Sequence, residues 1–202
     1  MFGDIMNKIE IFPASFTDNP YDYFATATDN NTALFAPGIG PCIGGLFYRQ
    51  GHVGLGHFDP MMDPVVRDIS RVVRPRMQEQ GTGDIGCMLY TGQSFAVRPE
   101  FQRQQGIERY YDYVRRIEEL GFIFGHDGSR TYILANEGPV LLIKKIQARL
   151  TGDNLDTVHV LMNYVDLDSK RKVKEASEEF EIDTRTHQTK VIQAFTGRRM
   201  FR

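Results

Sequence analysis

The residues of this chain best suited to covalent chemistry are a cysteine and a histidine, Cys42 and His57, each set among glycines. Glycine has no Cβ atom, so its backbone can approach a neighbouring group closely. A thiol attacks as its thiolate, and a nearby imidazole can take the thiol proton and form an ion pair with the sulfur. The pair therefore predicts nucleophilic catalysis with Cys42 as the nucleophile and His57 as the base.

The loop before Cys42 contains two prolines that stiffen it and glycines that leave its backbone accessible. Backbone N–H groups in such a loop can stabilise a developing oxyanion. We therefore expect a substrate and oxyanion loop formed by Gly38, Gly40 and Gly56. A lone cysteine in an apolar stretch is more often a core residue. A tight hairpin that needs glycine only for its turn would explain the glycines, but it would leave His57 unexplained.

Two adjoining strands are expected to carry the pair. The segments Cys42 to Tyr48 and Val53 to Phe58 are apolar and compatible with strands, and Arg49 to His52 forms a turn between them. A helix then begins near Asp63, an N-cap candidate followed by Pro64, and Pro75 should end or kink it. Further strands are expected over residues 8–12, 23–28, 32–36 and 85–90.

The second half of the chain predicts one more helix and several strands. The helix spans about 107–120, and strands are expected over 121–125, 130–134, 140–146, 158–165 and 190–195. The charged segment 169–179 is interpreted as a solvated helix or loop. We expect a catalytic domain over residues 1–148 and a C-terminal appendage, 149–202, packed on the same domain.

Composition excludes several classes of protein. The 202 residues are 41% hydrophobic and 25% charged, which excludes a wholly disordered or fibrous chain. The net charge of −2 argues against nucleic acid as the main partner. Two cysteines cannot make a disulfide framework, and no apolar run reaches the ~20 residues needed to cross a bilayer. We expect a cytoplasmic protein without membrane insertion, cofactor or metal site; export as an effector stays an open alternative.

The blocks around Cys42 and His57 resemble those of a known family. The segment Gly38 to Ile43 is similar to the Gly-Leu-Gly-Ser-Cys-Val signature of CheD, the chemoreceptor glutamine deamidase of bacteria. The segment Val53 to Phe58 resembles that family's Gly-Gly-Met-x-His-Phe block, at a similar spacing. Weaker resemblance extends over roughly residues 30 to 146 and preserves the order of the elements.

The resemblance implies an α+β fold, a layered α/β/β sandwich with mixed sheets that is shared with cytotoxic necrotizing factor. It also implies hydrolysis of glutamine side chains in a target protein, which is a chemoreceptor or another cellular or host protein. The family's histidine-orienting threonine corresponds to Ala36 here, where only the backbone carbonyl could serve. Pro41 replaces the usual serine and has no N–H to donate. His126 is a candidate second histidine beside the site.

Two alternatives stay open. One is a non-catalytic CheD-like module that binds a protein partner, for which the substitutions at Ala36 and Pro41 argue. The other is a small-molecule cysteine hydrolase of the same superfold, which would need His126 as a further catalytic group.

Overall fold

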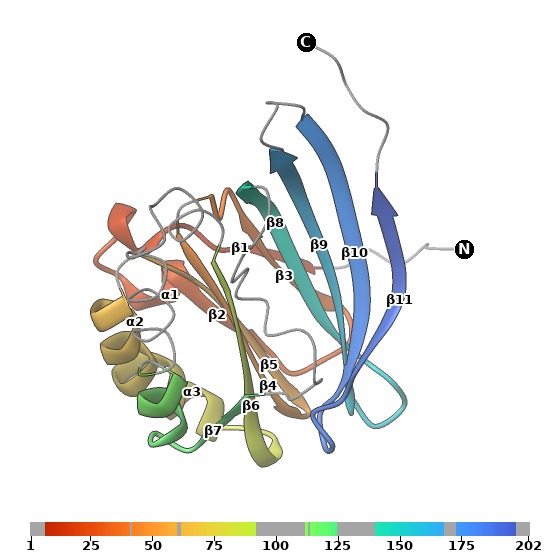
Figure 1. The fold of residues 1–202 in the computed structure, drawn as a ribbon. Helices are drawn as coiled ribbons and strands as arrows, with labels where there is room; N and C mark the ends of the chain where they lie inside the picture. Colours follow the sequence, from red (N-terminus) through yellow and green to blue (C-terminus); the bar gives the residue numbers. More distant parts are fainter. Residues whose placement is uncertain are drawn as a thin grey trace.

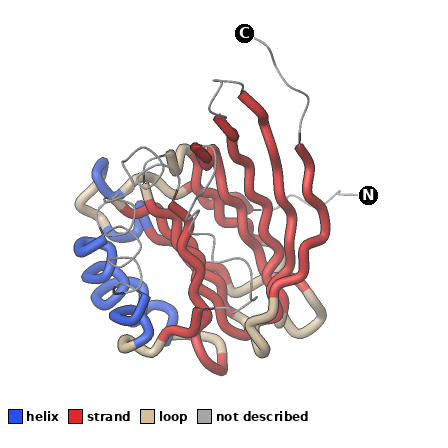
Figure 2. Tube along the Cα trace, in the orientation of Figure 1, coloured by secondary structure: helices blue, strands red, loops and turns tan. Residues whose placement is uncertain are grey.

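The fold consists of two β-sheets that face each other, with helices on the outer side of one of them (Figures 1 and 2). The structure, a computed structural model, describes residues 7–40, 42–59, 62–91, 112, 114–124, 140–167 and 173–196. Two mixed sheets with few helices, as the sequence predicts, are therefore present.

The first sheet has six strands, in the order β1-β3-β8-β9-β10-β11. Their bounds are β1 (Asn7–Glu10), β3 (Thr32–Pro37), β8 (Val140–Thr151), β9 (Thr157–Leu167), β10 (Val173–Asp183) and β11 (Thr189–Thr196). Only the pairing of β1 with β3 is parallel. In Figure 1, β9, β10 and β11 extend beyond the edge of the rest of the molecule.

The second sheet has five strands, in the order β2-β5-β4-β6-β7. Their bounds are β2 (Phe24–Ala27), β4 (Ile43–Gln50), β5 (His52–Phe58), β6 (Thr82–Thr91) and β7 (Phe122–Phe124). The pairing of β6 with β7 is parallel and the others are antiparallel. The hairpin β4–β5, which carries Cys42 at its start and His57 near its end, lies in the middle of this sheet.

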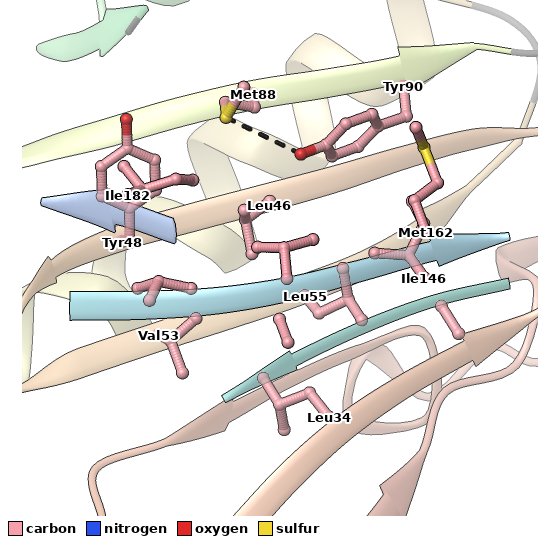
Figure 3. Packing of buried hydrophobic residues seen from close by; sticks show 14 of the residues in the cluster. Leu34, Leu46, Tyr48, Val53, Leu55, Met88, Tyr90, Ile146, Met162 and Ile182 are labelled. Atoms are coloured by element: carbon pink, nitrogen blue, oxygen red, sulfur yellow. Dashed lines mark hydrogen bonds between the residues drawn. The ribbon is translucent and has the colours of Figure 1, made fainter. Parts of the chain in front are cut away.

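Two apolar cores hold the layers together. One lies between the sheets and includes the residues labelled in Figure 3, among them Leu34 and Ile146 of the six-stranded sheet and Leu46 and Leu55 of the other. The other lies between the five-stranded sheet and its helices. Because strand side chains alternate between faces, the buried apolar residues of β4 and β5 divide between the two cores.

The helical layer covers the five-stranded sheet. It includes the 3₁₀ turn η1 (Ala14–Phe16), α1 (Pro20–Tyr23), α2 (Met62–Asp68), the π-helical turn η2 (Ile69–Val73), α3 (Arg74–Gln78) and the helical residues 114–118. From α2 to α3 a buried side chain recurs every fourth residue, at Val65, Ile69, Val73 and Met77. The expected break at Pro75 takes the form of a π turn directly before α3, after which the helix continues to Gln78. A wider turn accommodates the missing N–H of proline.

One prediction was wrong: the charged segment 169–179 is not a helix or loop where it is described, because β10 begins at Val173. Charge alone suggested a solvated element, but the residues alternate. Ala176, Phe180 and Ile182 are buried, whereas Glu175 is exposed and pairs with Lys144 at 2.9 Å. This alternation is the pattern of a strand with one face on the core.

The boundary expected after residue 148 falls inside β8, and β9, β10 and β11 pair onward from that strand. The expected strand 130–134, residues 107–111 and 113 of the expected helix 107–120, and His126 lie outside the described residues, whereas residues 114–118 are helical as expected. Within the described part of the chain, no helix is long and apolar enough to cross a membrane.

Candidate active site

Strand register brings the two predicted catalytic residues to the same end of one hairpin. In the antiparallel pairing of β4 with β5, Gly44 is opposite His57 and Ile43 is opposite Phe58. Cys42 precedes β4 by one residue, so continuing this register places it opposite Asp59. Residues two apart on an extended strand share a face, and diagonal neighbours on adjacent strands are ~7–8 Å apart. Cys42 and His57 are therefore diagonal neighbours across the hairpin.

The face that His57 shares is the one between the sheets. Leu55 and Val53, two and four residues earlier on β5, belong to the inter-sheet core, whereas Phe58 belongs to the core under the helices. His57 itself is completely buried, with 0% of its surface exposed. Cys42 is only partly buried. The Cys42 thiol thus lies where solvent reaches, and the His57 imidazole lies in the interior.

The glycines of the hairpin make room for neighbouring side chains. A Cβ atom on Gly44 would come within 2.7 Å of the Ile146 side chain, and one on Gly45 within 2.7 Å of the Phe58 ring. At Gly56 a Cβ atom would collide with the Phe58 ring. Packing therefore accounts for these glycines, and Gly56, expected in the oxyanion loop, lies inside β5, paired with Gly45.

The loop before Cys42 is held by hydrogen bonds of its own backbone. The N–H groups of Gly38 and Gly40 donate to the carbonyls of Lys144 and Ile143, at 2.6 and 2.9 Å. The N–H of Cys42 donates to the carbonyl of Ile39 at 2.6 Å and closes a tight turn. Gly38 and Gly40 adopt left-handed φ values of 63° and 41°, which favour glycine. All three N–H groups are occupied in this structure, so an oxyanion would have to displace one of these bonds.

The electrostatics of the site differ from the expected thiolate–imidazolium pair. Burial, and then the Asp59 carboxylate, raise the pKa of the Cys42 thiol. Burial lowers the pKa of His57 to about 4, although the Ile11 backbone and Asp59 oppose that shift. Near pH 7 both groups are therefore neutral. A neutral imidazole is the form that can accept a proton from a thiol.

Neither ring nitrogen of His57 makes a hydrogen bond of normal geometry, although both are buried and the Ile11 backbone lies close enough to raise the pKa of the ring as a hydrogen-bond partner. Buried polar groups in native proteins are nearly always paired, so an unpaired buried imidazole indicates a role beyond packing. The expected orienting group, the Ala36 carbonyl, is poorly placed for this ring. The carbonyl of Phe35 accepts from the N–H of Ile11, and successive carbonyls alternate in direction, so that of Ala36 faces β8, where Ala36 pairs with Ile146.

Asp59 was not anticipated as part of this site. It follows β5 directly, and its Oδ1 atom is buried without a hydrogen-bond partner. Its carboxylate influences the pKa values of both Cys42 and His57. The sequence could have indicated Asp59 by its position two residues after His57, because side chains two residues apart on a strand lie on the same face.

Two other histidines, His52 and His159, have structural partners. The Nδ1 atom of His52 lies 3.1 Å from the Gln80 carbonyl, and the Nε2 atom of His159 lies 2.6 Å from Glu179 Oε1. Among the described residues, no group of three or more His, Cys, Asp or Glu side chains is arranged to hold a metal ion.

Comparison with known proteins finds no family model that matches the chain and no curated protein with significant sequence similarity to it. What this site does is therefore inferred from its own geometry and from the sequence blocks that surround Cys42 and His57.

Proposed function

We propose that this protein is a cysteine-dependent hydrolase that converts glutamine side chains of a target protein to glutamate. The observation that carries the proposal is the hairpin register, which pairs Gly44 with His57 and so brings a partly exposed thiol beside a buried, unpaired imidazole. The resemblance of both sequence blocks to CheD supports an amide of glutamine as the substrate. The two mixed sheets under a helical layer are the architecture that this resemblance implies.

The neutral resting state of the two groups suggests how the reaction starts. As the Cys42 sulfur bonds to the amide carbon, the thiol proton passes to His57, so no free thiolate needs to accumulate. His57 then gives that proton to the departing nitrogen, the C–N bond breaks and ammonia leaves. A thioester remains on Cys42.

Hydrolysis of the thioester completes the cycle. A water molecule loses a proton to His57 as it attacks the thioester carbon, and the C–S bond breaks to release the glutamate side chain. The proton on His57 returns to the sulfur and restores the thiol. The balance is one water consumed and one ammonia released for each glutamine converted.

The test uses a blocked Gln-Gly dipeptide and unfolded casein as probes. The wild type should release ammonia from at least one of them, and mass spectrometry should find glutamine converted to glutamate. Hydroxylamine should divert the thioester to a γ-hydroxamate, which reports the covalent intermediate directly. Ammonia release that persists in Cys42→Ser would show that the thiol is not the nucleophile and would overturn the proposal.

A second function is favoured by two specific observations: the raised pKa of the Cys42 thiol and the occupied N–H groups of the loop before it. Both suit a module that retains the shape of the hydrolase and binds a protein partner without catalysis. That function predicts no ammonia release from either probe. It also predicts equal affinity of the wild type and Cys42→Ser for the same partner.

A further inference from the structure

The site contains one charged side chain whose position neither the fold nor the proposed chemistry has explained. Asp59 lies immediately after β5, at the open end of the hairpin, where Cys42 immediately precedes β4. Its Oδ1 atom is buried and has no hydrogen-bond partner. Because a buried acceptor without a donor is rare in native proteins, it indicates a partner that is acquired in another state of the site.

The backbone places this carboxylate next to both Cys42 and His57. Asp59 follows the last residue of β5 and lies two residues after His57, so continuation of the extended backbone places both side chains on the same face. Continuation of the β4–β5 register places Asp59 opposite Cys42. The influence of its charge on both groups agrees with this placement.

The needs of His57 and Asp59 are complementary. A neutral imidazole has one N–H donor and one acceptor nitrogen. Both nitrogens of His57 are buried without a hydrogen bond of normal geometry, and the Ile11 backbone and the Asp59 carboxylate both raise the pKa of the ring. A carboxylate that accepts from the N–H would leave the other nitrogen free to face the thiol. Catalytic hydrogen bonds are often long or misaligned in a free enzyme and tighten only with substrate bound.

We propose that Asp59 is the positioning residue that orients His57, accepting a hydrogen bond from one imidazole N–H so that the other nitrogen exchanges protons with Cys42. This proposal rests on the hydrolase function proposed above. Asp59 would take over the orienting role of the threonine hydroxyl that Ala36 lacks, because the Ala36 carbonyl faces β8. When His57 becomes an imidazolium, the adjacent carboxylate also stabilises its charge.

The test compares two conservative variants of Asp59 with a control carboxylate. Asp59→Asn retains the shape of the side chain and removes its charge, whereas Asp59→Glu retains the charge. Asp68, on α2, is the matched control. Burial raises its pKa, and the Asp59 carboxylate raises it further, so Asp68 lies near Asp59 but on a different element from His57. Ammonia release from the dipeptide gives kcat and KM for each protein.

We expect Asp59→Asn to lower kcat by about 10²-fold with KM nearly unchanged, since positioning a base contributes on this scale. Asp59→Glu should recover part of that loss, and Asp68→Asn should stay close to the wild type. The pH profile of Cys42 alkylation by iodoacetamide should move to lower pH in Asp59→Asn, because the carboxylate raises the thiol pKa. A more reactive thiol in a slower enzyme is a combination that a merely structural role would not produce. An unchanged or raised kcat in Asp59→Asn overturns the proposal.

A second measurement separates this inference from the proposed function. The titration of His57, followed by NMR in ¹⁵N-histidine-labelled protein, needs no substrate. A fall in the His57 pKa in Asp59→Asn, with the wild-type value kept in Asp59→Glu, supports the pairing even if the wild type hydrolyses neither probe, which would overturn only the hydrolase function. An unchanged His57 titration in Asp59→Asn overturns the pairing whatever the activity.

Discussion

A cysteine and a histidine lie near each of two regions of the β4–β5–β6 sheet, but only one region places the two side chains on the same face. At the first end, Cys42 is partly exposed and lies diagonal to the unpaired His57. Toward the other, Cys87 is fully buried in the core under the helices. A histidine, His187, lies there too, with its ring 5.6 Å from that of Tyr48.

The two ends differ in whether solvent reaches the thiol and in whether the thiol and the imidazole lie on the same face of the sheet. Cys87 points toward the helices, whereas Tyr48, which His187 contacts, belongs to the inter-sheet core. Strand alternation thus separates that thiol from that imidazole by the thickness of the sheet. At the Cys42 end, the thiol and the imidazole share one face and the thiol reaches solvent. A cysteine and a histidine near the same strand are therefore not enough, because their side chains must also lie on the same face of the sheet.

The largest expected contrast between the ends is in activity. Cys42→Ala should lower ammonia release from the dipeptide by about 10³-fold or more, because it removes the nucleophile. Cys87→Ala should leave kcat unchanged and cost about 1 kcal/mol of stability through a small cavity. Steady-state kinetics and urea unfolding of the two variants measure both effects. Equal loss of activity in both would remove the distinction between the ends.

The next effect is acid destabilisation through His57. Its pKa is lowered from 6.5 to about 4 in the folded protein, so the unfolded chain binds the proton more readily. The stability that comes from keeping this ring neutral is complete above pH 6.5 and is lost as the pH falls toward 4. The shift amounts to about 3 kcal/mol in the free energy of unfolding.

Urea unfolding of the wild type and His57→Gln at pH 7 and pH 4 tests this linkage. The wild type should lose more stability between the two pH values than the variant does. A loss of the same size in both proteins would mean that His57 is not buried in its neutral form.

Alkylation should separate the two thiols under native conditions. The rate at which iodoacetamide modifies Cys42 should rise with pH, with a midpoint above the pH range of ordinary thiols, because burial and Asp59 raise the pKa of Cys42. Cys87, which has no exposed surface, should react only after unfolding. Peptide mapping after labelling at several pH values measures both rates. Rapid modification of Cys42 at pH 7 would instead indicate a preformed thiolate.

The smallest effect is expected at His187. This residue has a left-handed φ of 59°, which is unfavourable for a residue with a side chain and natural for glycine. His187→Gly relieves that backbone cost and loses the contact with Tyr48, so the free energy of unfolding should change by less than about 1 kcal/mol. Ammonia release should stay at the wild-type rate. A large loss of activity would show that the two ends are coupled.

Local patterns in the sequence predicted most of the elements near the site. The two apolar segments and the turn expected from Arg49 to His52 predicted the bounds of β4 and β5 to within one or two residues. The prediction failed for β10, where the density of charge obscured the period-two burial of Ala176, Phe180 and Ile182. Composition averages over both faces of a strand, and only the pairing partners show which face is buried.

For the site, the sequence by itself determined the residue types and their place at one end of a hairpin. Cys42 and His57 could be proposed because short-range features, glycines and a turn, control the geometry of adjoining strands. The tertiary structure decided what these features could not. In the folded protein, carbonyls of β8 accept hydrogen bonds from the N–H groups of Gly38 and Gly40, and the Ala36 carbonyl faces the same strand. The His57 ring is buried without a hydrogen bond of normal geometry. The tertiary structure also buried an oxygen of Asp59, because burial depends on the second sheet and the helices, which are remote in the sequence.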